Sequence, residues 1–507
     1  MKFLVSDIET DNLLDALTKF HCAVTIDYFT GEEKYYRPWD FAQYIADIEE
    51  CAAAGGIVAF HNGIGFDHPA LRKLKKLLLG SNLNLPQQNV LDSLVMSRLI
   101  YSNLKDIDMG LVRTGKLAGR YMGQHSLKAW GFRLGEFKGD YGEQEAAWEE
   151  FNEPMMDYCA QDVRVTVKLL QKFFSNRWYF PDGDVSFQCE SMRLEHDAAW
   201  LLAKQERNGY AFDVEGAERL EMNLRIERET IKQQLVDTFG SWYAPKGGTQ
   251  PFLHPRTGQP LPKYPRVKYP KSGAMYNKDG KTKAKTLYYE GCPFTPVKYI
   301  EFNPASRDHI AKCLKEVCGW VPTKQTDAGN DVVDDETLKA MIEHNVFGDE
   351  MSKKVQMIRD YLVNQKTLGM LADGKNSWLK KQKDGYIHGR VNPNGAVTGR
   401  ATHSSPNLGQ VPGCHDKKGV GVAYKGKECR ELFGAYHHKD INTGERWIQV
   451  GVDASGLELR CLGHFMARYD QGAYIDVILN GDIHTTNQLA AGLPTRDNAK
   501  TFNTGRL

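Results

Sequence analysis

The sequence WIQVGVDASGLELRCLGHFMAR, residues 447–468, joins an alternating apolar segment to a helical one through a single acid. Ile448, Val450 and Val452 alternate along the chain, as they would in a half-buried strand. Asp453 ends this alternation. Apolar residues then recur at helical spacing, at Leu457, Leu459, Leu462 and Met466. An aspartate at the carboxyl end of a strand can face solvent and a metal ion. The alternative is an ordinary aspartate that begins a turn or caps the helix.

The sequence of residues 453–460, Asp-Ala-Ser-Gly-Leu-Glu-Leu-Arg, closely resembles the first palm carboxylate motif of the family A DNA polymerases. It is most similar to the replicative polymerases of short-tailed phages, and the resemblance extends from Asp7 to about Phe502. It implies that Asp453 and Ala454 belong to the metal site of the polymerase palm. It also implies that Glu458 excludes ribonucleotides by crowding their 2′ hydroxyl.

Composition limits the class of protein. A chain of 507 residues predicts roughly three or four domains of about 100–200 residues. The net charge is +1, so any surface that binds nucleic acid must be local. Ten cysteines without zinc-type spacing indicate reduced thiols, which suits the cytoplasm of a host cell. No apolar run approaches the roughly 20 residues of a membrane span. Asp7 follows the initiator methionine too closely for a signal peptide.

Acidic residues follow two apolar segments near the amino terminus. Residues 2–6 predict a buried strand that ends just before Asp7, and the period of two places Asp7 and Glu9 on one face. A second apolar strand, residues 56–60, leads to Asp67. Carboxylates that converge without nearby cations repel one another, so such a group normally holds metal ions. Oxygen ligands favour Mg²⁺, with Mn²⁺ as the alternative. The alternative for each single acid is a separate surface residue or helix cap.

Residues 153–168 predict a helix on which Tyr158 and Asp162 share a face. The order DxE, HNxxxFD and YxxxD resembles the DEDD-type proofreading exonucleases, in the variant with tyrosine. The resemblance implies that Tyr158 orients the attacking water. It also implies a set of carboxylates that hold two metal ions: Asp7, Glu9, Asp67 and Asp162. Asp92 resembles a family position near this site, and its sequence context predicts an ordinary helix N-cap.

The middle of the chain changes from helical periodicity to a basic segment. Residues 185–239 predict helices, which the resemblance assigns to the polymerase thumb. Between residues 242 and 298 there are eleven Lys or Arg but only two acids, with frequent Pro and Tyr. This composition predicts an extended loop module rather than a compact domain. The composition of this segment does not distinguish between a hydrated linker, a DNA contact and a partner surface. The segment resembles the thumb insertion that binds host thioredoxin in the phage polymerases.

Residues 387–412 are rich in Gly, Asn, Ser and Thr, and they predict an ordered loop. Its sequence resembles the segment that contacts the primer-template junction, which assigns Arg400 and Gln410 to nucleic acid. The alternative for Arg400 is a surface ion pair.

A helix that starts near Pro494 would place Arg496 and Lys500 on one face. Two cations at a helix amino end make a triphosphate site reasonable. Resemblance to the fingers motif implies that Arg496 and His484 contact the β and γ phosphates and that Lys500 assists pyrophosphate departure.

The family continues with a tyrosine where this sequence has Thr504, and it carries a second palm acid in a His-Asp hairpin. The sequence printed here reaches Leu507 without that acid. We therefore expect the amino-terminal portion of a polymerase with a complete exonuclease and an incomplete polymerase site, either from a split gene with a second polypeptide or by truncation. The alternatives are a stand-alone 3′–5′ exonuclease and a non-catalytic subunit that binds DNA and thioredoxin.

The expected fold is α/β + α. It has a ribonuclease H-like 3′–5′ exonuclease domain at 1–180, a helical thumb at 181–390 with the insertion 242–298, a partial palm at 391–470 and the start of the fingers at 471–507. The expected function is DNA-directed DNA synthesis in phage replication, with proofreading. The expected cofactors are two Mg²⁺ ions in the exonuclease site and two in a completed polymerase site. The expected substrates are primer-template DNA, single-stranded 3′ ends and dNTPs.

Overall fold

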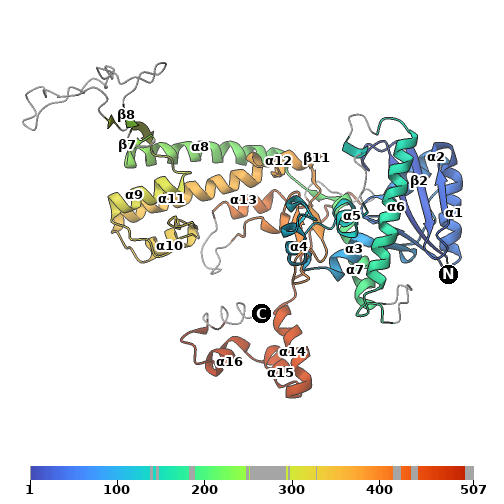
Figure 1. Ribbon diagram of the computed structural model, residues 1–507. Coiled ribbons are helices and arrows are strands. Elements are labelled where there is room, and N and C mark those ends of the chain that lie inside the picture. Colours follow the sequence, from blue (N-terminus) through green and yellow to red (C-terminus); the bar gives the residue numbers. More distant parts are fainter. Residues whose placement is uncertain are drawn as a thin grey trace, which may run out of the picture. The chain divides into compact units, whose positions relative to one another are not determined.

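The computed structural model describes residues 2–136, 141–143, 148–181, 189–246, 250–251, 293–294, 297–326, 328–414, 424–435, 443–496 and 499. The chain forms two compact units, Met1–Phe433 and Gly434–Leu507. Figure 1 traces the elements of each unit along the chain. Among the helices in the described ranges, none combines the length and the apolar composition that a bilayer span requires.

A five-stranded sheet lies at the amino-terminal end of the first unit, in the order β3-β2-β1-β4-β5. The strands are β1 (Phe3–Thr10), β2 (Phe20–Asp27), β3 (Glu33–Tyr36), β4 (Ile57–Phe60) and β5 (Val90–Asp92). Strand β1 is antiparallel to β2 and parallel to β4, and β4 is parallel to β5. The parallel pairing of β1 ends at Val5 opposite Ala59. Beyond that point β1 continues along β2 alone.

Helices cover both faces of this sheet (Figure 1). One face packs against α1 (Phe41–Ala53) and α2 (Asp67–Leu79), and the other packs against α6 (Glu153–Phe174). Alternation along β1 explains the division, because Leu4 and Ile8 belong to the first core while Phe3 and Val5 belong to the second. Three shorter helices flank the sheet: α3 (Ser93–Ile100), α4 (Leu104–Arg113) and α5 (Leu127–Leu134).

The rest of the first unit is mainly helical. Its elements are α7 (Glu190–Asn208), β6 (Tyr210–Ala211), α8 (Val214–Phe239), α9 (Arg307–Cys318), α10 (Asp335–Glu343), α11 (Asp349–Leu368), α12 (Trp378–Lys381) and α13 (Gly426–Glu431). Helices α8 and α11 lie side by side in Figure 1. They run antiparallel, because Leu235 and Val355 share one core while Leu224 and Leu368 share another.

The basic segment begins and ends on a two-stranded ladder. Strand β7 (Ser241–Pro245) pairs antiparallel with β10 (Val297–Glu301). Strands β8 (Gln250–Pro251) and β9 (Pro293–Phe294) pair next along the chain. The extended-loop prediction for the remainder of the segment falls on residues 252–292, outside the described residues.

The second unit contains three described helices, α14 (Leu457–Asp470), α15 (Ala473–Asn480) and α16 (Ile483–Ala490). The predicted helix from Leu457 is therefore confirmed. Gly463 is buried where α14 meets α15, since a Cβ there would lie 2.8 Å from Ile475 Cγ1. Its lack of a side chain allows the two helices to approach closely.

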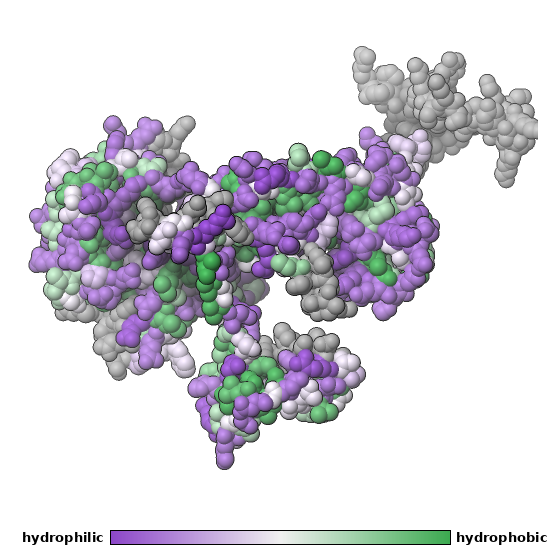
Figure 2. Space-filling view, turned by 180° about the vertical axis from the view of Figure 1, so that it is seen from behind, coloured by the Kyte–Doolittle hydropathy of each residue, from purple (hydrophilic) through white to green (hydrophobic). Residues whose placement is uncertain are grey.

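The predicted strand before Asp453 is wrong. Ile448, Val450 and Val452 are 83%, 75% and 93% exposed, and residues 447–453 belong to no regular element. Alternation indicates which side chains share a face, but a strand also needs a neighbour for its N–H and C=O groups. No described segment provides one. Figure 2 shows apolar side chains on the surface of this second unit, in the lower body of the view.

Candidate active sites

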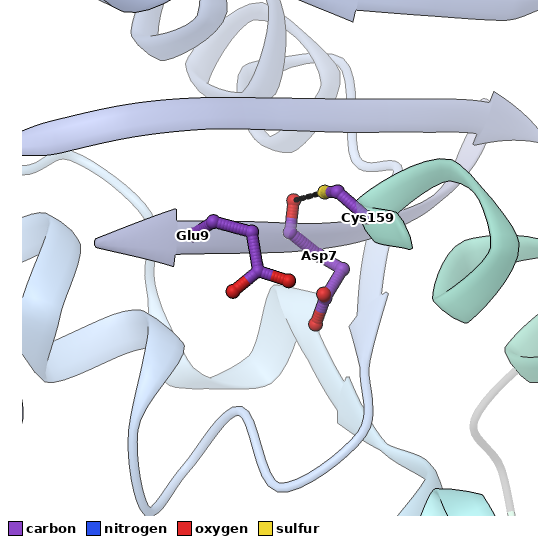
Figure 3. A group of neighbouring side chains, drawn as sticks. All are labelled: Asp7, Glu9 and Cys159. Carbon is purple, nitrogen blue, oxygen red and sulfur yellow. Dashed lines mark hydrogen bonds between the residues drawn. The ribbon is translucent and has the colours of Figure 1, made fainter. Parts of the chain in front are cut away.

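Asp7 and Glu9 lie within β1 rather than after it, because the strand extends to Thr10 instead of ending at Ser6. Antiparallel pairing with β2 explains the extension, since Asp7 pairs with Val24 and Glu9 with Cys22. The prediction that the two acids share a face is confirmed: both are partly exposed while Ile8 between them is buried. Figure 3 shows both carboxylates on the same side of the strand.

Helix α6 packs over these acids. The Cys159 thiol donates to the Asp7 carbonyl oxygen at 3.5 Å (Figure 3). Ligand atoms of Asp7, Glu9 and Cys159 all lie within 4.8 Å of one another. Burial raises the pKa of the Cys159 thiol, so the sulfur is a proton donor here rather than an anionic ligand. The sequence analysis did not identify Cys159 as part of this group. Its position directly after Tyr158 in the predicted helix is the feature that could have indicated it.

Asp67 is the first residue of α2 and is only 3% exposed. Burial raises the pKa of its carboxyl well above the usual value, and the negative charges of Asp7 and Asp92 raise it further. Its Oδ1 atom has no hydrogen-bond partner among the described residues. A buried carboxylate oxygen beside two other acids is costly unless a cation compensates it.

Tyr158 and Asp162 lie one turn apart on α6, as predicted. Asp162 is buried, and the Thr166 hydroxyl donates to its backbone carbonyl at 2.9 Å. The Tyr158 ring packs against Tyr141 and Trp148, with centroid distances of 5.8 and 6.0 Å. These contacts limit the directions in which the phenol can point.

The donor chemistry of this group fits a hard divalent cation. Three acids come from β1 and α2, and a fourth comes from α6, which packs on β1. All of them offer oxygen, which Mg²⁺ and Mn²⁺ prefer over sulfur or nitrogen. The Oδ1 of Asp67 is the strongest single indication, because no described residue bonds to it and a metal ion would supply a partner.

Asp92 is the N-cap of α3, as predicted, and its carboxylate accepts from Leu94 N at 2.9 Å. The same side chain also accepts from Asn62 N at 2.9 Å and from Ile64 N at 3.0 Å. Residue spacing does not indicate these two longer-range bonds.

Arg400 and Gln410 lie in the first unit, Arg400 near the tip of an irregular hairpin and Gln410 in a turn that follows the hairpin. Strand β13 (Arg390–Asn392) pairs with β14 (Thr402–Ser404), and Gln410 ends a short 3₁₀ turn (Leu408–Gln410). The ordered-loop prediction is therefore confirmed. Both side chains are exposed, and the Arg400 carbonyl accepts from Ala396 N at 3.0 Å, which closes the hairpin tip.

The remaining predicted polymerase residues lie in the second unit. Asp453, Ala454 and Glu458 are all exposed. Asp482 caps α16 by accepting from His484 N at 3.1 Å, which fixes the position of His484 at the start of that helix. Lys500, the remaining predicted triphosphate contact, lies outside the described residues.

Arg496 forms a bidentate ion pair with Asp482, through Nε at 2.8 Å and a terminal nitrogen at 3.1 Å. The hydrogen bond from Arg496 is the main reason that the pKa of Asp482 lies well below its usual value. The guanidinium is therefore held at the amino end of α16, where an anion would also be favoured. A triphosphate would have to compete with Asp482 for it.

Comparison with known proteins finds relatives that align with almost the whole chain. A family model described as DNA polymerase family A matches residues 282–505. The DNA-directed DNA polymerases of Enterobacteria phage T3 and Escherichia phage T7 are each 52% identical over 540 aligned positions, covering 99% of this chain and 75% of the relative. The POL domain of Pol1 from M. smegmatis, solved in complex with DNA primer-template and dNTP, has a TM-score of 0.58 at 14% identity. That match covers 99% of this chain and 67% of the other and shows a shared fold.

Proposed function

The chain belongs to the family A DNA polymerases and is a phage-type DNA-directed DNA polymerase, and on this premise we propose that its amino-terminal sheet carries a 3′–5′ proofreading exonuclease of ribonuclease H-like fold. Enzymes of this family depend on divalent metal ions. We propose which residues of this chain hold such ions for hydrolysis and which residues bind the polymerase substrates.

The observation that carries the exonuclease proposal is the placement of Asp7 and Glu9 side by side under α6, with the buried, unpaired Oδ1 of Asp67 in the same group of acids. Asp162 on α6 completes the set. These four acids would hold two Mg²⁺ ions, or Mn²⁺ in their place. Bound there, the ions would activate a water and stabilise the leaving 3′ oxygen.

Tyr158 supports the reaction through its hydroxyl. The rings of Tyr141 and Trp148 hold the phenol on the face of α6 that carries Asp162. From this position the hydroxyl would orient the attacking water toward the phosphodiester. The phenol does not need to lose its proton for this role.

An end-labelled single strand tests the proposal. The purified chain with Mg²⁺ should shorten the strand from its 3′ end, and Asp7→Ala with Glu9→Ala should abolish the activity because both metal ligands on β1 are lost. Exonuclease activity that survives in the double variant at the wild-type rate would overturn the assignment.

We propose that the polymerase substrates contact two groups of residues. Arg400 on the β13–β14 hairpin and Gln410 in the turn that follows it would bind the primer-template, which their exposure permits. In the second unit, His484, Arg496 and Lys500 would bind the triphosphate. Three further residues would complete the palm, with Asp453 and Ala454 at its metal site and Glu458 at the sugar.

Two partners are proposed on separate grounds. Host thioredoxin would bind the basic insertion 242–298, because the segment resembles the thioredoxin-binding thumb insertion of the phage polymerases and its charge and aromatic content suit a partner surface. A second polypeptide would cover the exposed apolar residues Ile448, Val450 and Val452, which otherwise face solvent. The enzyme would act in the cytoplasm of the host cell, where a phage genome is replicated.

A further inference from the structure

We propose that Asp92 is a positioning residue of the exonuclease: its buried carboxylate fixes the loop that presents Asp67, and His196 of α7 fixes Asp92 in turn. This inference rests on the proposed exonuclease site. It assigns to Asp92 and His196 a control over metal affinity that goes beyond capping a helix.

The Asp92 carboxylate joins two elements through three backbone amides. Oδ1 accepts from Asn62 N and from Leu94 N, each at 2.9 Å, and Oδ2 accepts from Ile64 N at 3.0 Å. The residue is 2% exposed. Hydrogen bonds to an ionised carboxylate are about twice as strong as neutral ones, and exclusion of water strengthens them further. The β4–α2 loop is therefore held against the start of α3.

The loop has few other conformations available. Asn62 has a φ of +70°, in the left-handed region that side chains rarely adopt. A Cβ on Gly63 would lie 2.5 Å from Phe60 Cβ, and one on Gly65 would lie 2.6 Å from Asn62 Oδ1. Phe66 N donates to the Asn62 carbonyl at 2.9 Å, and Asp67 follows directly. A displacement at Asn62 would therefore reach the Asp67 carboxylate.

His196 of α7 holds the backbone of Asp92 in place. The Asp92 backbone amide donates to His196 Nε2 at 2.9 Å. His196 Nδ1 lies 2.8 Å from the Met192 carbonyl and donates to it, which leaves Nε2 as the acceptor. The ring is 2% exposed, and burial lowers the pKa of His196, so the ring is neutral. A residue of α7 thereby supports a loop more than 120 positions earlier in the chain.

A matched pair of variants separates positioning from general stability. Asp92→Asn keeps the side-chain shape, but one of its two accepting atoms becomes an NH₂ group that faces a backbone N–H. Asp47 is the control, because it is also a largely buried aspartate in this sheet domain; its carboxylate accepts from Tyr36 Oη and Gln43 Nε2, each at 2.7 Å. Asp47→Asn should lower stability without disturbing the Asp67 loop.

The experiment is calorimetric titration of the full chain with Mn²⁺, without DNA. The exonuclease signal is the binding that Asp7→Ala with Glu9→Ala removes. Asp92→Asn should weaken this binding roughly 10–100-fold, the usual effect of losing a group that orients a metal ligand. Asp47→Asn should leave it unchanged. The Mn²⁺ concentration for half-maximal exonuclease rate should shift in parallel, with the rate at saturation largely retained.

His196→Leu provides a second variant if Asp92→Asn does not fold, since it removes the acceptor for the Asp92 amide and keeps the Asp92 carboxylate. It should also weaken Mn²⁺ binding. If folded Asp92→Asn binds Mn²⁺ with wild-type affinity, the positioning inference is overturned and the exonuclease proposal stays intact. If Asp92→Asn does not fold, wild-type Mn²⁺ affinity in folded His196→Leu has the same meaning. A wild-type chain whose Mn²⁺ binding is unaffected by Asp7→Ala with Glu9→Ala would overturn both.

Discussion

Asp67 shows at the residue scale how the proposed metal site would conflict with folding. Its carboxyl is buried, its Oδ1 has no partner among the described residues, and the nearby charges of Asp7 and Asp92 are of the same sign. Each of these features disfavours the ionised form in the absence of a cation. In the proposed exonuclease site the same features would make Asp67 a strong cation ligand.

The pH dependence of stability should show this conflict. Because the folded state raises the pKa of Asp67, the stabilising contribution of its proton is complete below the ordinary value near 4 and is lost as the pH rises through the raised value. In EDTA, Asp67→Asn should therefore melt higher than wild type at pH 8 and show a smaller difference at pH 5. A gain of 1 kcal/mol corresponds to about 2–4 °C in a domain of this size.

Thermal unfolding of both proteins in EDTA between pH 5 and 8 measures the effect. Divalent metal ion added at pH 8 should stabilise the wild type more than the variant. Identical melting temperatures across the whole pH range would show that Asp67 carries no unfavourable charge.

Arg496 offers a second test at this scale. A triphosphate that displaces Asp482 would gain hydrogen bonds to a charged group, which contribute about 1.5–3 kcal/mol. Arg496→Ala should weaken dNTP binding roughly tenfold or more. Arg468→Ala in the same unit is the matched control, because its guanidinium lies over the Tyr469 ring. Equal dNTP affinities of the two variants, measured by fluorescence titration, would remove Arg496 from the triphosphate site.

At the scale of elements, sequence periodicity predicted the parts of the amino-terminal sheet domain whose patterns are local. Asp7 and Glu9 lie two residues apart on β1, and Tyr158 and Asp162 lie four apart on α6, so their shared faces followed directly. The contacts of Asp92 with Asn62 and Ile64 join residues 28 or more positions apart and leave no periodic signal. The predicted strand before Asp453 was wrong for a related reason, since alternation does not reveal whether a pairing strand exists.

The ion pair between α4 and α5 yields a prediction about elements. Arg133 donates to Asp108 through two nitrogens at 2.9 and 2.8 Å, and the Asp108 side chain is fully buried. Arg133→Ala should cost about 3–5 kcal/mol, because it leaves a buried charge without its partner. Arg164→Ala should cost at most about 1 kcal/mol, although Arg164 also binds Glu33 through two nitrogens, since that pair is partly exposed. Urea unfolding measures both, and equal costs would contradict the burial argument.

At the scale of the whole molecule, one chain carries a sheet domain with clustered acids, a long helical region and a second, smaller unit. The paired strands β7 and β10 connect the basic insertion to the helical region. Tyr243 and Tyr299 lie against each other on this ladder with a centroid distance of 5.2 Å, and both are largely exposed. An exposed aromatic pair beside a basic segment is suited to a partner surface.

Replacement of residues 252–292 by a short Gly-Ser linker, with the β7–β10 ladder retained, should remove thioredoxin binding. Exonuclease turnover on short single strands should stay near the wild-type value, because the acids of β1 and α6 belong to the sheet domain. Calorimetry with thioredoxin and the intact chain measures the first effect. No affinity in the intact chain would reject the thioredoxin proposal, whereas a steep salt dependence of DNA binding would indicate a DNA contact instead.

Anomalous diffraction from crystals grown with Mn²⁺ tests the central claim most directly, because it locates the ions themselves. We expect two peaks roughly 3.5–4 Å apart, bound by carboxylate oxygens of Asp7, Glu9, Asp67 and Asp162, with Tyr158 beside them. Well-ordered carboxylates with no peak among them at saturating Mn²⁺ would show that these acids do not hold the ions.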